Sequence, residues 1–239
     1  MPGKFLGRRT TRRVHPDSIV CDASSLIALT DAGLIGTLIF LLPYMRGDLY
    51  ITTGVKREAI DRPMRIPEYM FSAVRLKRAF NDGIFKMIDP SDRTVKEILN
   101  LANSIFMING RPFRLVHRGE AEMLASAVEY GLKTVLMDER TTRTLMEAPL
   151  EMRSHLTGEF HTRVDVDREA LDLFKEMTKG ISIIRSAEIV ALAYESNYFK
   201  KFREMETEAF ESALYAVKFY GCAISFDEIR EILREENAL

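Results

Sequence analysis

Short apolar runs that stop at an acidic residue recur along this chain, and each is followed by residues that favour a helix. Residues 19–21 lead into Asp22 and two serines, and residues 134–137 lead into Asp138. Brief β-branched runs are typical of buried strands, whereas Ser, Thr and Asp favour the first positions of helices. Because strand and helix alternate in this way, the chain is predicted to be an α/β protein with a central parallel sheet.

The rest of the sequence predicts a sheet of four to five strands with connecting helices. Strands are predicted at 19–21, 48–52, 84–88, 134–137 and 181–184. Helices are predicted at 68–80, 91–108, 120–130, 141–147, 165–178, 186–195, 198–220 and 225–235, whereas 151–164 is polar with weak periodicity. Ser225 and Glu228 form the capping-box pattern at the start of the last helix. The final two helices form a predicted helical extension over 198–239.

Composition excludes several classes of protein. The two cysteines, Cys21 and Cys222, are too few for a disulfide framework. The apolar stretch 33–44 is too short to cross a bilayer, and the N-terminus lacks the apolar core of a signal peptide. We therefore expect a cytoplasmic protein without a membrane partner.

The N-terminal segment 1–16 is strongly basic. It contains five Lys or Arg residues and no acidic residue. Such an arm is able to follow a phosphate backbone, but a passive solvated terminus has the same composition. Both interpretations remain open at the level of sequence.

Four acidic residues lie where the predicted sheet ends: Asp22, Glu58, Glu120 and Asp138. Carboxyl ends of adjacent parallel strands meet at one crevice, so these carboxylates should converge there. At neutral pH they would repel one another unless a cation lies between them. Carboxylate oxygens are ligands that Mg²⁺ and Mn²⁺ prefer, and we therefore predict a site for Mg²⁺ or Mn²⁺.

Each acid also has a simpler interpretation. Glu58 and Glu120 fall in first turns of predicted helices, where the helix dipole alone favours an acid. A soft-metal site is not indicated, because His155 and His161 are six residues apart in a polar stretch without a cysteine pair. The joint pattern of four acids is what favours a hard-metal site.

Other polar residues flank the predicted crevice. Ser24 is placed to hydrogen-bond Asp22 or a water at the metal. Arg118, Arg140 and Arg143 are placed to bind phosphate or to neutralise spare carboxylates. No Ser–His–Asp or Cys–His spacing indicates a protein nucleophile.

Four segments around these acids resemble the motifs of the PIN-domain family, metal-dependent ribonucleases that include the toxins of VapBC pairs. The segment 22–29 is similar to the opening motif, and 55–60 is similar to the second, in which glutamate follows valine by three residues. The segment 119–122, Gly-Glu-Ala-Glu, resembles a variant in which Glu120 replaces the more common Asp. The segment 136–143 is similar to an Asp-Asp-Arg…Arg motif, with Glu139 replacing the second Asp.

The resemblance covers 18–148 and implies a three-layer sandwich with a metal-dependent endoribonuclease site. It implies that Asp22, Glu120 and Asp138 bind the metal, with Glu58 binding directly or through water, and that RNA is the substrate. If 181–198 supplies the last strand and helix, then a PIN-like domain spans 17–197 with an insertion at 151–179. Arg185-Ser186 then stands where the family often has Gly-Thr, and Glu122 competes with Glu120 as the third acid.

Two further functions are consistent with the same resemblance. One is a binding or regulatory module that retains its acids but acts through partners, such as an antitoxin. The other is a nuclease that cleaves DNA or structured RNA, because a site that contacts phosphates does not distinguish nucleic acids. A toxin of a toxin–antitoxin pair and an RNA-processing nuclease are both compatible with the acids.

The apolar residues of 198–220 recur at helical spacing and give this segment a broad apolar face. A helix of this kind must bury that face, either on its own α/β core or against a second subunit. Intrachain packing and a homodimer are therefore both open.

Overall fold

The computed structural model describes residues 14–238 and contains a five-stranded sheet, all of whose strands are parallel. Most of the predicted basic arm, residues 1–13, lies outside the described residues. The strand order is β3-β2-β1-β6-β8. The bounds are β1 (Ile19–Cys21), β2 (Leu49–Ile51), β3 (Phe85–Met87), β6 (Thr134–Leu136) and β8 (Ser182–Ile184). The predicted parallel α/β sheet is confirmed.

The register of the sheet aligns the carboxyl ends of its central strands. Cys21 pairs with Leu136, and Leu136 pairs with Ile184. The backbone pairing continues just past the strands, because Asp22 N–H donates to the carbonyl of Leu136 at 2.9 Å. The residues that follow β1, β6 and β8 therefore emerge at the same edge.

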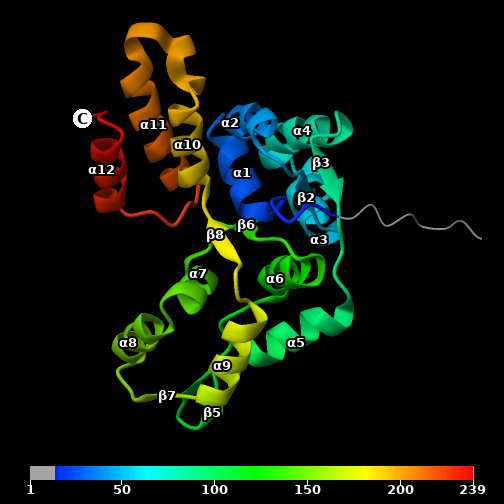
Figure 1. The fold of residues 1–239 in the computed structure, drawn as a ribbon, viewed down its shortest axis with the longest axis vertical. Helices are drawn as coiled ribbons and strands as arrows, with labels where there is room; N and C mark the ends of the chain where they lie inside the picture. The colour runs from blue at the N-terminus through cyan, green and yellow to red at the C-terminus, as the bar shows by residue number, and fades with distance from the viewer. Residues whose placement is uncertain (1–13, 239) are drawn as a thin grey trace, which may run out of the picture.

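Helices cover both faces of the sheet (Figure 1). One face carries the larger hydrophobic core, built with α1 (Ala23–Asp31), α2 (Ile35–Leu41), α4 (Pro67–Asn81), α10 (Ser186–Glu195), α11 (Glu206–Phe219) and α12 (Phe226–Glu235). The other face is covered by α6 (Arg118–Tyr130), whose Met123 and Ala127 reach the same core. Short helices η1 (Leu42–Tyr44), α3 (Thr53–Lys56), η2 (Arg57–Asp61) and η3 (Pro63–Arg65) connect β1, β2 and α4.

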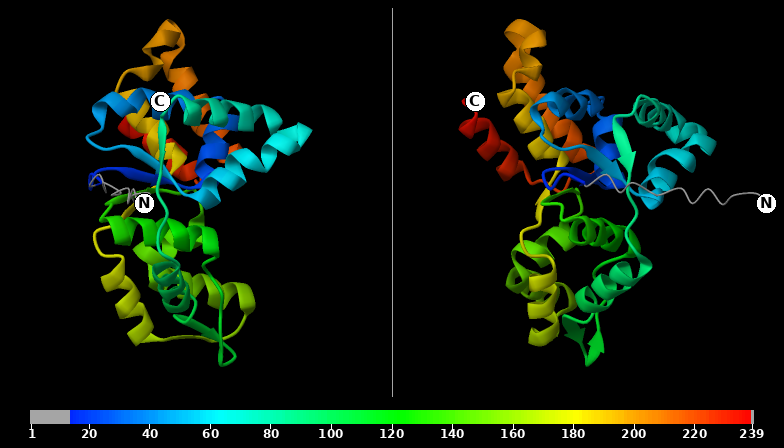
Figure 2. Two further views of the ribbon diagram at one scale, coloured as in Figure 1. Left: turned by 90° about the vertical axis from the view of Figure 1, so that its right-hand side faces the viewer. Right: turned by 45° about the vertical axis from the view of Figure 1, so that its right-hand side comes forward.

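A second hydrophobic core lies beyond α6, in the lower part of Figures 1 and 2. It is built by α5 (Asp92–Ala102), α7 (Arg140–Glu147), α8 (Pro149–Phe160), α9 (Arg168–Met177) and the buried face of α6. A small antiparallel sheet of β4 (Phe106–Ile108), β5 (Arg111–Pro112) and β7 (Val164–Val166) closes its end. The segment predicted as an insertion, 151–179, thus packs against α5 as part of this lobe.

In this lobe two predicted helices have different bounds in the structure, and one helix was not predicted. The helix predicted over 91–108 ends at Ala102, because Asn103 turns the chain and its side chain bonds the backbone of Leu115 and Val116. Residues 106–108 then form β4 through pairing with β7, a distant contact that periodicity does not reveal. Conversely, α8 lies largely within the polar stretch 151–164, and α9 begins only at Arg168 after Asp167 caps it.

The C-terminal extension packs on its own chain. The helix predicted over 198–220 is broken into η4 (Tyr198–Met205) and α11, because Arg203 has a left-handed φ of 57°. Phe210, Leu214 and Val217 of α11 are fully buried in the larger core. The capping box of Ser225 and Glu228 forms as predicted at the start of α12.

Within residues 14–238, no single helix is long and apolar enough to cross a membrane. Only the pair Ala23–Asp31 and Ile35–Tyr44 has that apolar length when combined, and it is bent by 111°. Buried residues of both helices belong to the larger core.

Candidate metal and nucleic-acid site

Asp22 lies at the junction of β1 and α1, where it caps the helix. Its Oδ2 accepts the backbone N–H of Ser24 at 3.1 Å and the hydroxyl of Ser24 at 2.5 Å. The cap satisfies an otherwise unpaired helix N–H and holds the carboxylate at the sheet edge. The predicted Ser24–Asp22 contact is therefore present in the structure.

Asp138 follows β6 and is 1% exposed. Both of its oxygens are held by Ser186, the first residue of α10: the backbone N–H donates to Oδ1 at 2.7 Å, and the hydroxyl donates to Oδ2 at 2.6 Å. A buried carboxylate that accepts two hydrogen bonds has a fixed orientation. Ser186 is a site residue whose role the sequence left open, and its position directly after the fifth strand was the signal for it.

Glu58 and Glu120 come from helices that begin at the same edge. Glu58 lies in the π-helical turn η2, a rare geometry that is frequent at functional sites. Glu120 lies in the first turn of α6, and its Oε2 is buried without a hydrogen-bond partner among the described residues. A buried oxygen without a partner is costly, so Glu120 requires a group that the protein does not itself supply.

The four acids influence one another electrostatically. Burial raises the pKa of Asp22, hydrogen bonds from Ser24 and the backbone of Ala23 oppose this, and the charge of Asp138 adds to the rise. Burial also raises the pKa of Glu58, followed by the charges of Asp22 and Glu120. Each of the four predicted acids therefore lies near enough to at least one other for their charges to interact.

The donor set fits a hard divalent cation. It consists of carboxylate oxygens from separate elements, one of them unpartnered, and their mutual repulsion is what a cation would relieve. Among residues 14–238, no group of three or more His, Cys, Asp or Glu side chains is already gathered at metal-binding distance. The chemistry of the donor set, and not a preformed cluster of side chains, is therefore what fits a cation among the described residues.

Glu122, the competing acid, has a different environment. Its Oε1 accepts from Nε of Arg118 at 2.8 Å, and a Cβ atom at Gly54 would lie 2.5 Å from its Oε2. Arg118 also donates to Asp92 at 2.7 Å. A phosphate that binds Arg118 must therefore compete with Glu122 and Asp92 for its guanidinium. The pair with Arg118 also gives the carboxylate of Glu122 a partner within the protein.

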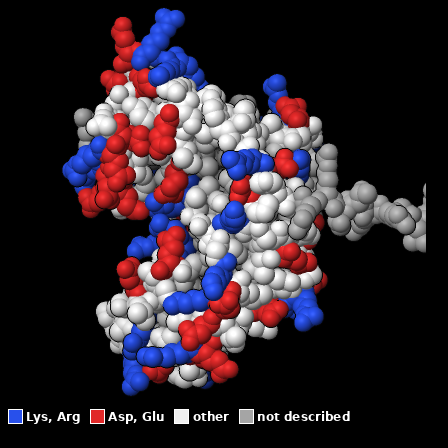
Figure 3. All heavy atoms as spheres, in the orientation of Figure 1, with Lys and Arg blue, Asp and Glu red and all other residues white. Residues whose placement is uncertain are grey.

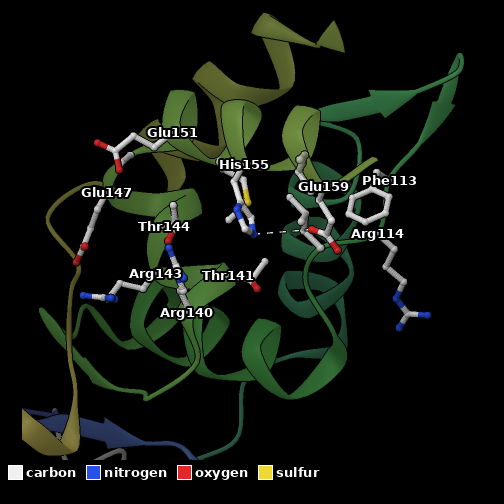
Figure 4. Close-up of a pocket in the computed structure, with 14 residues that line it drawn as sticks. Phe113, Arg114, Arg140, Thr141, Arg143, Thr144, Glu147, Glu151, His155 and Glu159 are labelled. Atoms are coloured by element: carbon white, nitrogen blue, oxygen red, sulfur yellow. Dashed lines mark ion pairs between the residues drawn. The ribbon is translucent and has the colours of Figure 1, made fainter. Parts of the chain in front are cut away.

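Arg140 and Arg143 lie on α7, immediately after Asp138. Glu139 caps this helix by accepting the N–H groups of Thr141 and Thr142, which removes Glu139 from the set of free acids. The two arginines line a groove of about 470 Å³ between α7, α8 and the segment 113–115 (Figure 4). Within the part of the chain that the structure describes, no ion pair or hydrogen bond engages either side chain.

The same groove contains residues that the sequence did not indicate. Arg114 and Phe113 lie on its wall, and His155 projects from α8 with its Nε2 3.8 Å from Glu159. Phe113 contacts Phe160 edge to face, with ring centroids 5.1 Å apart. No local motif marks these residues, because the pairing of β4 with β7 and the packing of α8 bring them beside α7.

The model of one protein family, the PIN domain, matches residues 18–149, and the chain belongs to this family. PIN domains are usually metal-dependent nucleases, in agreement with the edge at which the acids meet. No curated protein and no solved structure matches the chain. The matched region contains all four acids but ends before β8 and Ser186.

Proposed function

We propose that this protein is a Mg²⁺- or Mn²⁺-dependent endoribonuclease. Asp22, Glu120 and Asp138 hold the cation, with Glu58 binding it directly or through water. The observation that carries the proposal is the buried Oε2 of Glu120, which has no partner among the described residues. Nearby, burial and then neighbouring acids raise the pKa values of Asp22 and Glu58. When bound, the cation supplies positive charge that activates a water for in-line attack and stabilises the charge that develops on the phosphate.

The protein's own residues prepare this site. Ser24 bonds Asp22 and Ser186 bonds Asp138, so the orientation of each strand-end carboxylate is held by a neighbouring serine. Burial and then the charge of Asp138 raise the pKa of Asp22, so protons compete with the cation increasingly as the pH falls. Activity is therefore expected to rise with pH as these carboxylates lose their protons.

The substrate is held on the α7 side of the acids. Arg140, Arg143 and Arg114 have no ion-pair partners among the described residues, so their charges are available for phosphate oxygens. Phe113 offers a face on which an unpaired base can stack, which favours single-stranded RNA. Phosphate contacts alone do not exclude DNA, so DNA is included in the test.

We also propose that the protein is cytoplasmic and that it binds a protein partner. The outer face of α4 exposes Tyr69, Met70, Phe71 and Val74, and contiguous apolar surface of this kind supports association with a second copy or with an antitoxin. A homodimer or a toxin–antitoxin pair would cover this face. The alternative function, a binding module without nuclease activity, depends on the same surface.

Cleavage of labelled single-stranded RNA, an RNA hairpin and single-stranded DNA of the same sequence tests the proposal. Each is incubated with Mn²⁺, Mg²⁺ or EDTA, and Asp138→Asn is compared with Glu122→Gln, whose acid is paired with Arg118. We expect metal-dependent cleavage of RNA that is lost in Asp138→Asn and retained in Glu122→Gln. Preferred cleavage of DNA would change the substrate class, and absence of cleavage by the wild type would favour the binding module.

A further inference from the structure

A buried arginine, Arg185, joins the C-terminal helix α12 to the edge of the sheet that carries the acids. Arg185 is 7% exposed and immediately follows β8. Its guanidinium pairs with Glu188 of α10 and donates from Nη1 to Oε1 of Glu228 of α12 at 2.8 Å. The same Nη1 donates to the carbonyl of Ala223 at 3.0 Å. A guanidinium buried to this degree is stable only when it has such partners. If Glu228 lost its charge, Arg185 would be left partly unpaired, and the backbone around residues 185–186 would be disturbed.

Two residues next to Arg185 contact Asp138: Ser186, which follows it in the chain, and Ala223, whose carbonyl it bonds. Ser186, the next residue in the chain, holds both oxygens of the Asp138 carboxylate. Ala223 N–H donates to the backbone carbonyl of Asp138 at 3.3 Å. The loop before α12 is thus part of the surroundings of Asp138.

Glu228 has a separate oxygen for each of its two tasks. Oε2 accepts the N–H of Ser225 at 2.8 Å and completes the capping box, while Oε1 accepts from Arg185. A glutamine at this position retains an acceptor for the cap but loses the charge that faces Arg185. The two roles can therefore be separated by a conservative substitution.

We propose that Glu228 is a positioning residue for the metal site: through Arg185 it holds the Arg185-Ser186 turn, and thereby Asp138, in the geometry that binds the cation. The inference rests on the metal site proposed above. It assigns to the C-terminal helix, which lies outside the region matched to the PIN domain, a role in the affinity for the cation. On the far side of Arg185, α12 exposes further acids, which Figure 3 shows gathered on this part of the surface.

The test is Mn²⁺ binding to the full chain, measured by titration calorimetry at pH 7.5 and at a temperature where every variant is folded. Outer partners of metal ligands typically contribute about 10–100-fold to metal affinity, and Glu228 acts one residue further out. We expect Glu228→Gln to weaken Mn²⁺ binding about tenfold or somewhat less. Glu231→Gln, on the same helix and in the same acidic groove, is the matched control and should bind as the wild type does.

Two further variants separate positioning from general stability. Ile229→Val lowers the stability of α12 by deleting a buried methyl group, without touching the ion pair, and should leave Mn²⁺ affinity unchanged. Equal loss of affinity in Ile229→Val and Glu228→Gln would overturn the positioning role, as would unchanged affinity in Glu228→Gln. Asp22→Asn should lose Mn²⁺ binding, and normal binding by this variant would show that the proposed metal site is wrong. If Asp22→Asn loses Mn²⁺ binding but Glu228→Gln binds normally, the metal site stands and only the positioning role of Glu228 is rejected.

Discussion

Ser186 donates two hydrogen bonds to Asp138, one to each carboxylate oxygen, at 2.7 Å and 2.6 Å. The contact joins the acid that follows β6 to the helix that follows β8. It forms because the two strands are parallel neighbours in register, so the residues after them emerge side by side. The PIN-domain match ends at residue 149, yet the carboxylate of Asp138 is held by a residue 48 positions after it.

Substitution of Ser186 by Ala tests this contact. The variant loses the hydroxyl bond to Oδ2 but keeps the backbone bond to Oδ1, so Asp138 becomes free to rotate. We expect Mn²⁺ affinity to fall about tenfold and the free energy of unfolding to fall by about 1–3 kcal/mol, because Oδ2 is buried. Ser182→Ala, at an exposed position of β8, is the control for calorimetry and thermal unfolding. Unchanged Mn²⁺ binding in Ser186→Ala would show that Asp138 is positioned without the hydroxyl.

The pH dependence of stability follows from the raised pKa values of Asp22 and Glu58. Between the ordinary carboxyl pKa of about 4 and the raised folded-state pKa, Asp22 and Glu58 are protonated in the folded protein but ionised in the unfolded chain. The stability contributed by the protonated acids is therefore lost as pH rises through their folded-state pKa. At pH 7 without metal, Asp22→Asn should raise the melting temperature, and this gain should vanish below about pH 4.

Divalent cations should reverse this effect in the wild type. A ligand at 100 times its Kd stabilises the folded state by about 2.7 kcal/mol, which corresponds to roughly 5–10 °C in melting temperature for a protein of this size. Thermal unfolding with Mn²⁺ should show this rise at pH 7.5, a smaller rise at pH 5, and almost none in Asp22→Asn. Equal rises in both proteins would place the cation elsewhere.

The choice between Glu120 and Glu122 is decided by comparing their glutamine variants. Glu120 has a buried oxygen without a described partner, whereas Glu122 pairs with the exposed Arg118. Glu120→Gln removes a direct ligand, so it should lower cation affinity and cleavage by more than the roughly 10–100-fold typical of an outer partner. Glu122→Gln should keep most activity, because a surface ion pair contributes only about 0–1 kcal/mol to stability. The opposite ranking in a cleavage assay would assign the third ligand to Glu122.

Local patterns in the sequence were sufficient for the sheet and for the acids at its edge. The strands that precede Asp22 and Asp138 were predicted correctly, as was the capping box at Ser225. Each of these features depends on residues that are neighbours in the sequence. The small sheet was missed although β4 and β5 pair across Asn109-Gly110, a dipeptide typical of hairpin turns. Its third strand, β7, lies about sixty residues from β4, which no local pattern reveals. Arg185 and Glu228 are 43 residues apart in the sequence, so local patterns could not predict their ion pair either.

The groove beside α7 makes a separate prediction about substrate binding. If Arg143 and Arg114 each contact one phosphate, then replacing either by Ala should weaken binding of a labelled single-stranded RNA. Each substitution should also reduce the slope of log affinity against log salt by about 0.7. Fluorescence anisotropy in EDTA measures this without cleavage. Arg78→Ala, which removes an exposed charge on α4, is the control, and an unchanged slope in both groove variants would exclude the groove from the substrate path.

The last prediction concerns α11 and distinguishes intrachain packing from a dimer. Phe210 is fully buried and stacks on Tyr194 with ring centroids 4.0 Å apart, whereas Phe219, on the same helix, is 73% exposed. Phe210→Ala should lower the free energy of unfolding by about 3–5 kcal/mol, because the cavity forms in the larger core. Phe219→Ala removes the same side chain from the surface and should change stability by no more than about 0.5 kcal/mol. Thermal unfolding and sedimentation of both variants provide the measurement. If Phe219→Ala instead converts a dimer to a monomer, the exposed end of α11 is the subunit interface, and the buried half still belongs to the core of its own chain.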